Sequence, residues 1–274
     1  MENLYLAFSD TTGNVWLTRI NQDTGNAIGT AQKILTPPQN HSYSVIGMAY
    51  NAKMDTMYLS LTVGNTNQPL PPKWNLFAIN KFNQNIHRCP QSLSAQLILT
   101  SNTLIRGIAY NNDTIYGINN NNVVYLIDVN SPNLDNSVTL TSMSPDFGNS
   151  INLAISDNTL FTFETPNGST SLFSFDLDNN IGDNRLIIGY PNNYNYIYSP
   201  PGIYSLTANK HGNLYGIYIN ATESSSGLMF LAKYDRSSPF VITQVSPSPI
   251  VNLQNSRGAL AFVPSKTKLS CNRH

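Results

Sequence analysis

The sequence predicts an all-β protein built from a repeated unit. Three observations lead to that fold class: a returning apolar run, a composition rich in turn formers, and the lack of helical periodicity. The returning run centres on an aromatic residue, and its copies lie at Tyr5, Tyr58, Tyr116, Phe161 and Tyr215. The steps between them are 53, 58, 45 and 54 residues. In a strand-rich chain, a repeat of this length indicates an array or a closed ring.

The composition supports many short strands joined by many turns. The chain has 274 residues, of which 41% are hydrophobic and 11% are charged, whereas roughly a quarter are charged in an average domain. Asn, Ser and Thr are abundant, and Asn favours turns because its side chain bonds nearby backbone groups. Fifteen basic residues balance fifteen acidic ones. No long-range field would attract nucleic acid, so we expect no nucleic-acid partner.

Each repeat resolves into four strand-like runs bounded by Asn, Asp, Gly, Pro or Ser. The first run carries small residues and is found at 46–50, 106–110, 152–155 and 204–207. The second contains the anchoring aromatic and spans 3–8, 55–60, 113–118, 158–163 and 212–217. The third is found at 15–20, 74–79, 123–127, 171–175 and 228–234, and the fourth at 32–35, 96–99, 138–140, 185–188 and 241–245. No window predicts a helix.

The two ends of the chain predict how the ring closes. The N-terminus begins directly with a second run and lacks the first run that precedes it elsewhere. A matching run, Arg257–Phe262, lies near the C-terminus and is similar to Arg106–Tyr110. We therefore expect this segment to complete the first sheet and leave no open repeat. Four strands per unit and five units predict a five-bladed β-propeller over residues 1–264, followed by a tail at 265–274.

This pattern resembles the five-bladed β-propeller superfamily at the level of architecture. The superfamily includes sugar-binding lectins similar to tachylectin-2 and several glycoside hydrolase families. The WD dipeptide of the commonest propellers is absent from the repeats, and no functional residue of either group matches this chain residue for residue. The resemblance implies a rigid ring that recognises a ligand on one of its rims.

One rim is expected to carry the ligand because its loops are uneven, and binding usually resides in loops of this kind. These loops lie at 64–73, 144–150, 190–201 and 221–227. The candidate ligand-binding residues near the axis on this rim are His41, Tyr43, Trp74, Arg106, Asn152, Tyr194, Tyr204 and Arg257. Aromatic rings would stack on sugar faces, and Asn and Arg would donate directional hydrogen bonds. The alternatives stay open: the rings of Tyr43, Trp74 and Tyr204 as packing between blades, the two arginines as strand ends, and His41 as plain surface.

Catalysis is not expected. A glycoside hydrolase needs two carboxylates about 5 to 9.5 Å apart, and the predicted innermost strands contain no Asp or Glu. The carboxylates near the uneven rim that could be recruited are Asp10, Asp146, Glu164 and Glu223. Others, such as Asp55 and Asp113, fit local turn bonds. The sequence favours a non-catalytic binding module for a glycan or protein ligand, with a hydrolase or a protein-interaction scaffold as alternatives.

We expect no cofactor and no metal, because the four His are scattered and neither Cys sits in a paired motif. The acid spacing of Asp176–Asp183 is similar to that of a calcium loop, but a hairpin turn explains it better. Cys89 and Cys271 are expected as free thiols, with a single clasp between them left open. No apolar run is long enough to span a membrane. Because no leader is recognisable, we expect synthesis in the cytosol, with leaderless export as an open alternative. We also expect a monomer.

Overall fold

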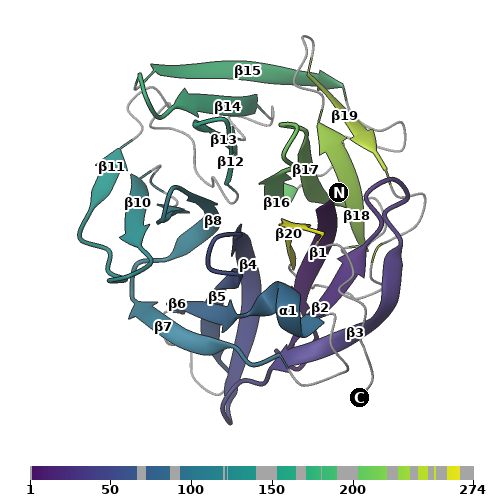
Figure 1. The fold of residues 1–274 in the computed structure, drawn as a ribbon, viewed down its shortest axis with the longest axis vertical. Coiled ribbons are helices and arrows are strands. Elements are labelled where there is room, and N and C mark those ends of the chain that lie inside the picture. Colours follow the sequence, from purple (N-terminus) through teal and green to yellow (C-terminus); the bar gives the residue numbers. More distant parts are fainter. Residues whose placement is uncertain are drawn as a thin grey trace, which may run out of the picture.

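The computed structural model describes residues 2–66, 72–86, 93–119, 121, 123–139, 153–164, 171–179, 181–189, 203–220, 228–234, 240–245, 250 and 258–265. Within these ranges the chain forms twenty strands and one short helix. The strands group into five antiparallel sets of four that surround a central axis (Figure 1). The predicted five-bladed β-propeller is therefore confirmed.

Each blade runs from an innermost to an outermost strand. Blade 1 comprises β20 (Gly258–Pro264), β1 (Glu2–Ser9), β2 (Val15–Ile20) and β3 (Ala27–Leu35), and blade 2 comprises β4 (His41–Asn51), β5 (Thr56–Asn65), β6 (Lys73–Asn80) and β7 (Gln96–Ser101). Blade 3 comprises β8 (Ile105–Asn111), β9 (Thr114–Asn119), β10 (Val123–Asp128) and β11 (Ser137–Thr139). Blade 4 comprises β12 (Ala154–Ser156), β13 (Thr159–Glu164), β14 (Ser171–Asp176) and β15 (Ile181–Gly189). Blade 5 comprises β16 (Ile203–Ala208), β17 (Leu214–Asn220), β18 (Leu228–Tyr234) and β19 (Phe240–Gln244).

The C-terminal strand closes the ring as the sequence predicted. Strand β20 pairs with β1 in antiparallel register from Glu2 opposite Pro264 to Phe8 opposite Gly258. The five innermost strands contact one another in the cyclic order β20, β4, β8, β12, β16 and back to β20. The two terminal segments thus belong to the same blade, and each of the five innermost strands contacts the innermost strands of both neighbouring blades.

The core is divided among the gaps between neighbouring blades. Five clusters of buried apolar side chains fill these five gaps. Alternation along a strand explains the division, because successive side chains point to opposite faces of a sheet. On β1, Tyr5 packs toward blade 2 while Leu6 packs toward blade 5. A single strand therefore contributes to two interfaces.

Small residues allow the inner strands to approach closely, as expected. A Cβ atom added at Gly47 on β4 would lie 2.9 Å from the backbone nitrogen of Ile108 on β8. That distance is too short for a real side chain, and the obstacle is backbone rather than a movable side-chain end. Glycine at this position sets the spacing between blades 2 and 3 near the axis.

One helix was not predicted from the sequence. Residues Phe82–Ile86 form α1 in the connection between β6 and β7. Asp55 holds its start, because one carboxylate oxygen accepts the backbone N–H of Asn83 at 2.7 Å and the other accepts that of Gln84 at 3.2 Å. Asp55 therefore makes long-range bonds, 28 and 29 residues along the chain, in addition to the local bond that it accepts from the Tyr50 hydroxyl.

Blades 4 and 5 are joined at their outer edges. The outermost strands β15 and β19 pair in parallel, with Ile187 opposite Phe240 and Gly189 opposite Val241. This contact merges two blades into one sheet of eight strands. Figure 1 shows β15 extending across to β19.

Candidate functional site

The ring has two rims that differ in their connections. We use "loop rim" for the side that holds the loops between second and third strands and between successive blades. We use "turn rim" for the side that holds the turns between first and second strands, at 51–55, 111–113, 156–158 and 209–213, together with α1. Five of the eight predicted ligand residues lie in described strands, toward the ends that face the loop rim: His41, Tyr43, Trp74, Arg106 and Tyr204. The structure describes the side chains of the first four.

A β-bulge recurs at the same place in three of the innermost strands. On β4 the pairing shifts between Val45 and Gly47, on β8 between Ile105 and Gly107, and on β16 between Ile203 and Ser205. The inserted residues are Ile46, Arg106 and Tyr204. Bulges of this kind redirect side chains and are frequent next to functional sites. Two predicted site residues, Arg106 and Tyr204, occupy these positions.

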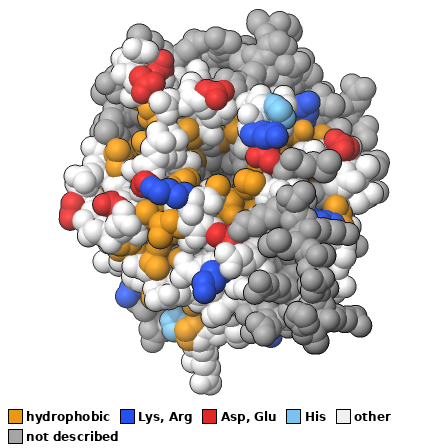
Figure 2. Space-filling model, in the orientation of Figure 1, with side chains coloured by type: hydrophobic (Ala, Val, Ile, Leu, Met, Phe, Trp, Pro, Cys, Tyr) orange, Lys and Arg blue, Asp and Glu red, His pale blue; other side chains and the backbone are white. Residues whose placement is uncertain are grey.

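The bulges lie at the loop-rim entrance to the axis. A cavity of about 90 Å³ runs along the axis, and its lining begins two residues further on, at Met48, Ile108 and Leu206. Segments of all five blades contribute to the lining, which is made of aliphatic side chains and Phe262 together with the polar residues Tyr50, Tyr110 and Thr207. None of the described lining residues carries a carboxyl group. Figure 2 shows apolar side chains around the middle of the opposite face, the turn rim.

Two predicted aromatic residues are packing residues instead. Trp74 is fully buried between blades 2 and 3, and its indole N–H donates to Ser60 Oγ at 2.7 Å. Tyr43 is buried between blades 1 and 2, with its ring edge-on to Phe77 at a centroid distance of 5.7 Å. Neither ring can stack on a ligand in this structure. This corresponds to the alternative of inter-blade packing that the sequence left open.

Of the other predicted ligand residues, His41, Arg106 and Tyr204 lie in described strands. His41 begins β4 on the loop rim, and its Nδ1 lies 2.9 Å from the carbonyl oxygen of Gln39. Arg106 is half-buried. For Tyr204 the structure places the backbone, in β16. Asn152, Tyr194 and Arg257 lie outside the described residues, and their roles stay predictions.

Asp10, a carboxylate that the sequence offered for catalysis, is occupied by local bonds. Oδ1 accepts bonds from the backbone of Thr12 and Asn14 and from the Thr12 hydroxyl at 2.7–2.9 Å, and Oδ2 accepts from the Asn14 amide at 3.1 Å and the Trp16 indole at 2.8 Å. Burial opposes ionisation, but these hydrogen bonds outweigh it and lower the pKa of Asp10 to about 2. A carboxyl group with this pKa is a poor proton donor near neutral pH.

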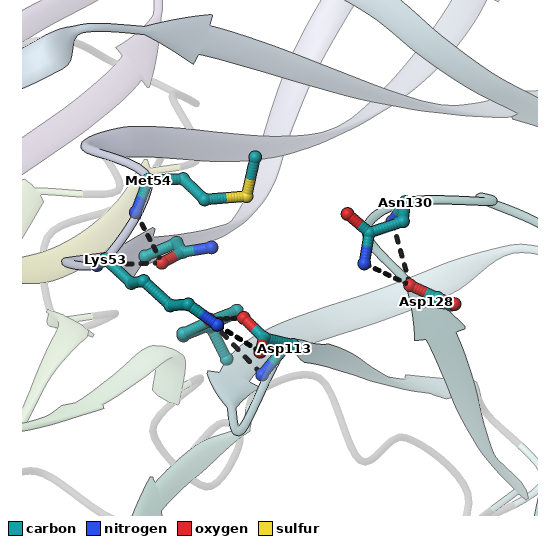
Figure 3. Close-up of polar contacts among 7 residues, drawn as sticks. Lys53, Met54, Asp113, Asp128 and Asn130 are labelled. Carbon is teal, nitrogen blue, oxygen red and sulfur yellow. Dashed lines mark hydrogen bonds and ion pairs between the residues drawn. The ribbon is translucent and has the colours of Figure 1, made fainter.

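The turn rim carries a polar network that links neighbouring blades. Lys53 Nζ on blade 2 donates to Asp113 Oδ2 on blade 3 at 2.8 Å (Figure 3). Asn111 of blade 3 donates to Asn158 of blade 4 at 2.8 Å, and Asn83 of α1 donates to the carbonyl oxygen of Pro264 at 2.8 Å. These bonds connect blade 2 with blade 3, blade 3 with blade 4, and blade 1 with blade 2. The first joins two exposed groups, so the two partly buried amide bonds are the ones expected to stabilise the ring.

Two tyrosines on the turn rim were missed by sequence reasoning. Tyr50 donates its hydroxyl to Asp55 Oδ1 at 2.8 Å, and Tyr110 donates to Asp113 Oδ1 at 3.0 Å. Burial and the adjacent Asp113 carboxylate raise the pKa of Tyr110 to about 12. Burial and Asp55 likewise raise the pKa of Tyr50. The repeated pairing of a terminal tyrosine with an aspartate three or five residues later was the available signal.

In the described part of the chain, no group of three or more His, Cys, Asp or Glu side chains could hold a metal ion. No helix in those ranges is long and apolar enough to cross a membrane. The acid-rich segment at Asp176 forms the predicted hairpin turn: Asp176 Oδ1 accepts the backbone N–H groups of Asp178 and Asn179, and Asp176 pairs with Ile181 across β14 and β15.

Comparison with known proteins supports the fold. No protein-family model and no curated protein matches the sequence significantly. Among solved structures, the chain is similar to a glycoside hydrolase of family GH43 engineered to display endo-xylanase and exo-arabinofuranosidase activity (10% identity, TM-score 0.58, 92% of this chain and 53% of that one). It is also similar to a GH43 β-1,3-galactosidase (10% identity, TM-score 0.58, 87% and 56%) and to a chain of a nidogen–laminin complex (11%, 0.52, 96% and 100%). The chain thus spans about half the length of the two hydrolases, and at these identities the likeness shows a β-propeller fold alone.

Proposed function

We propose that this protein is a non-catalytic binding module whose ligand is held where the innermost strands enter the axis from the loop rim. The observation that supports this most is the recurrence of a bulge in β4, β8 and β16. A bulge interrupts ladder hydrogen bonds and is retained where it re-aims a side chain. Because the bulge recurs next to the axial cavity, it supports a ligand site at the point where the innermost strands of the blades meet.

A protein segment is the ligand class that the described residues favour. The three bulge positions hold an aliphatic, a cationic and an aromatic residue, so the site differs from blade to blade. A ring that binds one sugar per blade would repeat its ligand contacts. Burial of Tyr43 and Trp74 also removes two rings that would have stacked on a sugar. Arg and Tyr are enriched among the residues that dominate protein interfaces, and Arg106 and Tyr204 fit that role.

The hydrolase alternative has less support. Its chemistry needs two carboxyl groups facing the substrate, and the described lining of the axial cavity supplies none. Asp10 lies on the loop rim, but its oxygens already accept five hydrogen bonds. The likeness to GH43 enzymes concerns the fold and brings no pair of carboxylates with it.

Selection from a displayed random peptide library tests the proposal. Peptides that bind are synthesised, and their dissociation constants are measured by fluorescence anisotropy for the wild-type protein and for Arg106→Gln. Loss of a central interface arginine should weaken binding by about tenfold or more. Lys53→Gln, which removes the same charge on the turn rim, is the matched control and should leave binding unchanged. Equal thermal unfolding of both variants shows that the fold is retained.

A glycan array run in parallel separates the two ligand classes. Glycan binding that Arg106→Gln abolishes would replace the protein ligand by a sugar. Failure of both screens, or peptide binding that depends on Lys53 and not on Arg106, would contradict the proposed site.

A further inference from the structure

A second hollow lies on the face of blade 1 that looks toward α1. Its volume is about 220 Å³, larger than the axial cavity. Strands β1, β2 and β3 line it from one side, and Ile86 at the end of α1 lines it from the other. Figure 1 shows α1 placed across from β2. The hollow is remote from the bulges of β4, β8 and β16, so it is a different site from the one proposed above.

The register of blade 1 explains which side chains face this hollow. Tyr5 on β1 lies opposite Arg19 on β2, and Arg19 lies opposite Ile28 on β3. Residues directly opposite in a sheet share a face, so these three side chains form one row across the blade. Leu17 on β2 and Gln32 on β3 form the next row on the same face.

A break in the β2–β3 ladder separates the two rows. Between Leu17 and Arg19 on β2 there is one residue, whereas between Ile28 and Gln32 on β3 there are three. The extra residues carry Gly29 in a left-handed conformation with φ of +79°, and a Cβ added there would meet nothing within 4 Å. The outward excursion of β3 therefore opens space beside the Arg19 row.

The Tyr5 side chain is buried as a whole, and it carries a polar hydroxyl group. Tyr5 is 2% exposed, and its ring packs edge-on against Phe82 of α1 at a centroid distance of 5.3 Å. Among the described residues, no hydrogen bond to its hydroxyl is formed. The hydroxyl is not one of the fully enclosed atoms without a partner, so it is accessible from the hollow that Tyr5 lines. Because the hydroxyl is accessible from the hollow, a ligand bound there can form the hydrogen bond that the described residues do not provide.

Arg19 adds a positive charge beside that hydroxyl. The side chain is half-buried, and in the described part of the chain its guanidinium forms no ion pair. Arg19 is close enough to Tyr5 to favour the ionised form of the phenol, although burial has the larger effect and raises the pKa of Tyr5. A guanidinium presents a fork of N–H donors that fits a carboxylate.

We propose that this hollow binds a small organic carboxylate with a short apolar portion. The Arg19 guanidinium and the Tyr5 hydroxyl donate to the carboxylate oxygens, while Leu17, Ile28 and Ile86 contact the apolar portion. The volume suits such a ligand, because an apolar cavity of about 150 Å³ holds benzene. The formal net charge of the chain is zero, so recognition would depend on this local pair of donors and not on the overall charge.

Benzoate is a suitable probe, and its neutral isostere benzamide is the matched ligand control. Binding is followed by two-dimensional NMR and isothermal titration up to about 10 mM, which detects a dissociation constant of roughly 1 mM, near −4 kcal/mol. Benzoate should shift the amide signals of β2 and β3 and saturate, whereas benzamide and inorganic phosphate should bind at least about tenfold more weakly. Phosphate that binds as well as benzoate would refute the apolar half of the site.

Variants decide between the proposed donors and general charge effects. Arg19→Gln should reduce benzoate affinity by about tenfold or more. Lys33→Gln is the matched control, since Lys33 lies on the same blade, pairs with Trp16 and is exposed on the opposite face. It should leave affinity unchanged.

Tyr5→Phe keeps the test valid even if Arg19→Gln disturbs the fold. It should weaken benzoate binding by about threefold or more, and the midpoint of thermal unfolding should stay the same or rise because an unpartnered hydroxyl is removed. A fall in that midpoint with unchanged affinity would show that the hydroxyl is structural. Absence of saturable benzoate binding, or equal losses in the Arg19 and Lys33 variants, would overturn the proposal.

Discussion

Leu260→Ala tests whether the C-terminal strand holds the first blade in place. Leu260 is fully buried in the cluster between blades 1 and 5, and its backbone N–H donates to Ser205 Oγ of blade 5 at 2.9 Å. Replacing Leu by Ala removes three carbons, or about 2.4 kcal/mol at roughly 0.8 kcal/mol each. The cavity left behind raises the loss toward about 3 to 5 kcal/mol.

Equilibrium unfolding in guanidinium chloride measures this loss. The two tryptophans, Trp16 and Trp74, lie in blades 1 and 2 and report the transition by fluorescence. Leu97→Ala is the matched control because Leu97 is 48% exposed on the outermost strand of blade 2. Its loss should be below about 0.5 kcal/mol, with the same denaturant slope.

The comparison separates ring closure from a loosely attached terminus. If Leu260→Ala costs less than about 1 kcal/mol, close to the Leu97 value, then β20 does not share the cooperative unit of blade 1. The pairing of β20 with β1 would then contribute little to the stability of the ring.

Three further predictions concern the polar groups. Asp10→Asn should cost about 1 kcal/mol at pH 7, since the shift from 3.8 to about 2 is discounted for partial exposure. This contribution is present above pH 4 and is lost as the pH falls toward 2, so the wild-type and variant acid-unfolding curves should converge there. Asp55→Ala should lower the free energy of unfolding by about 2–3 kcal/mol. Native-state hydrogen exchange should become faster at the backbone amide of Asn83, which donates to Asp55. An unchanged exchange rate would contradict the role of Asp55 in stabilising the start of α1. Lys53→Gln should leave the thermal midpoint unchanged despite the 2.8 Å contact with Asp113, because both groups are exposed and screened; a clear drop would show that the blade 2–3 link is stronger than its exposure implies.

Much of the fold could be predicted because its signals are local. The strand runs are marked by β-branched and aromatic residues between turn formers, and every predicted run lies in or overlaps a strand. Closure was also visible, since the similarity of Arg257–Phe262 to Arg106–Tyr110 is a property of the sequence itself. The structure describes this strand at Gly258–Pro264, and Arg257, the predicted start, lies outside the described residues.

Features that depend on distant contacts could not be predicted. The five residues of α1 are too few to show a helical period, and the stabilising acceptor is Asp55 from the distant turn between β4 and β5. The burial of Trp74 depends on Ser60 from the neighbouring strand and on blade 3. The bulge at Arg106 is a property of strand pairing, which a single strand's sequence does not reveal.

The pairing of β15 with β19 has a consequence for how the ring comes apart. A blade whose outer edge is free can open by itself, whereas these two blades share a hydrogen-bonded edge as well as a packed interface. Protection from amide exchange in blades 4 and 5 should therefore be lost together, as one unfolding unit twice the size of a blade. The same contact covers two strand edges that would otherwise be templates for association with another chain, and β3, β7 and β11 are the remaining outer sheet edges among the described strands.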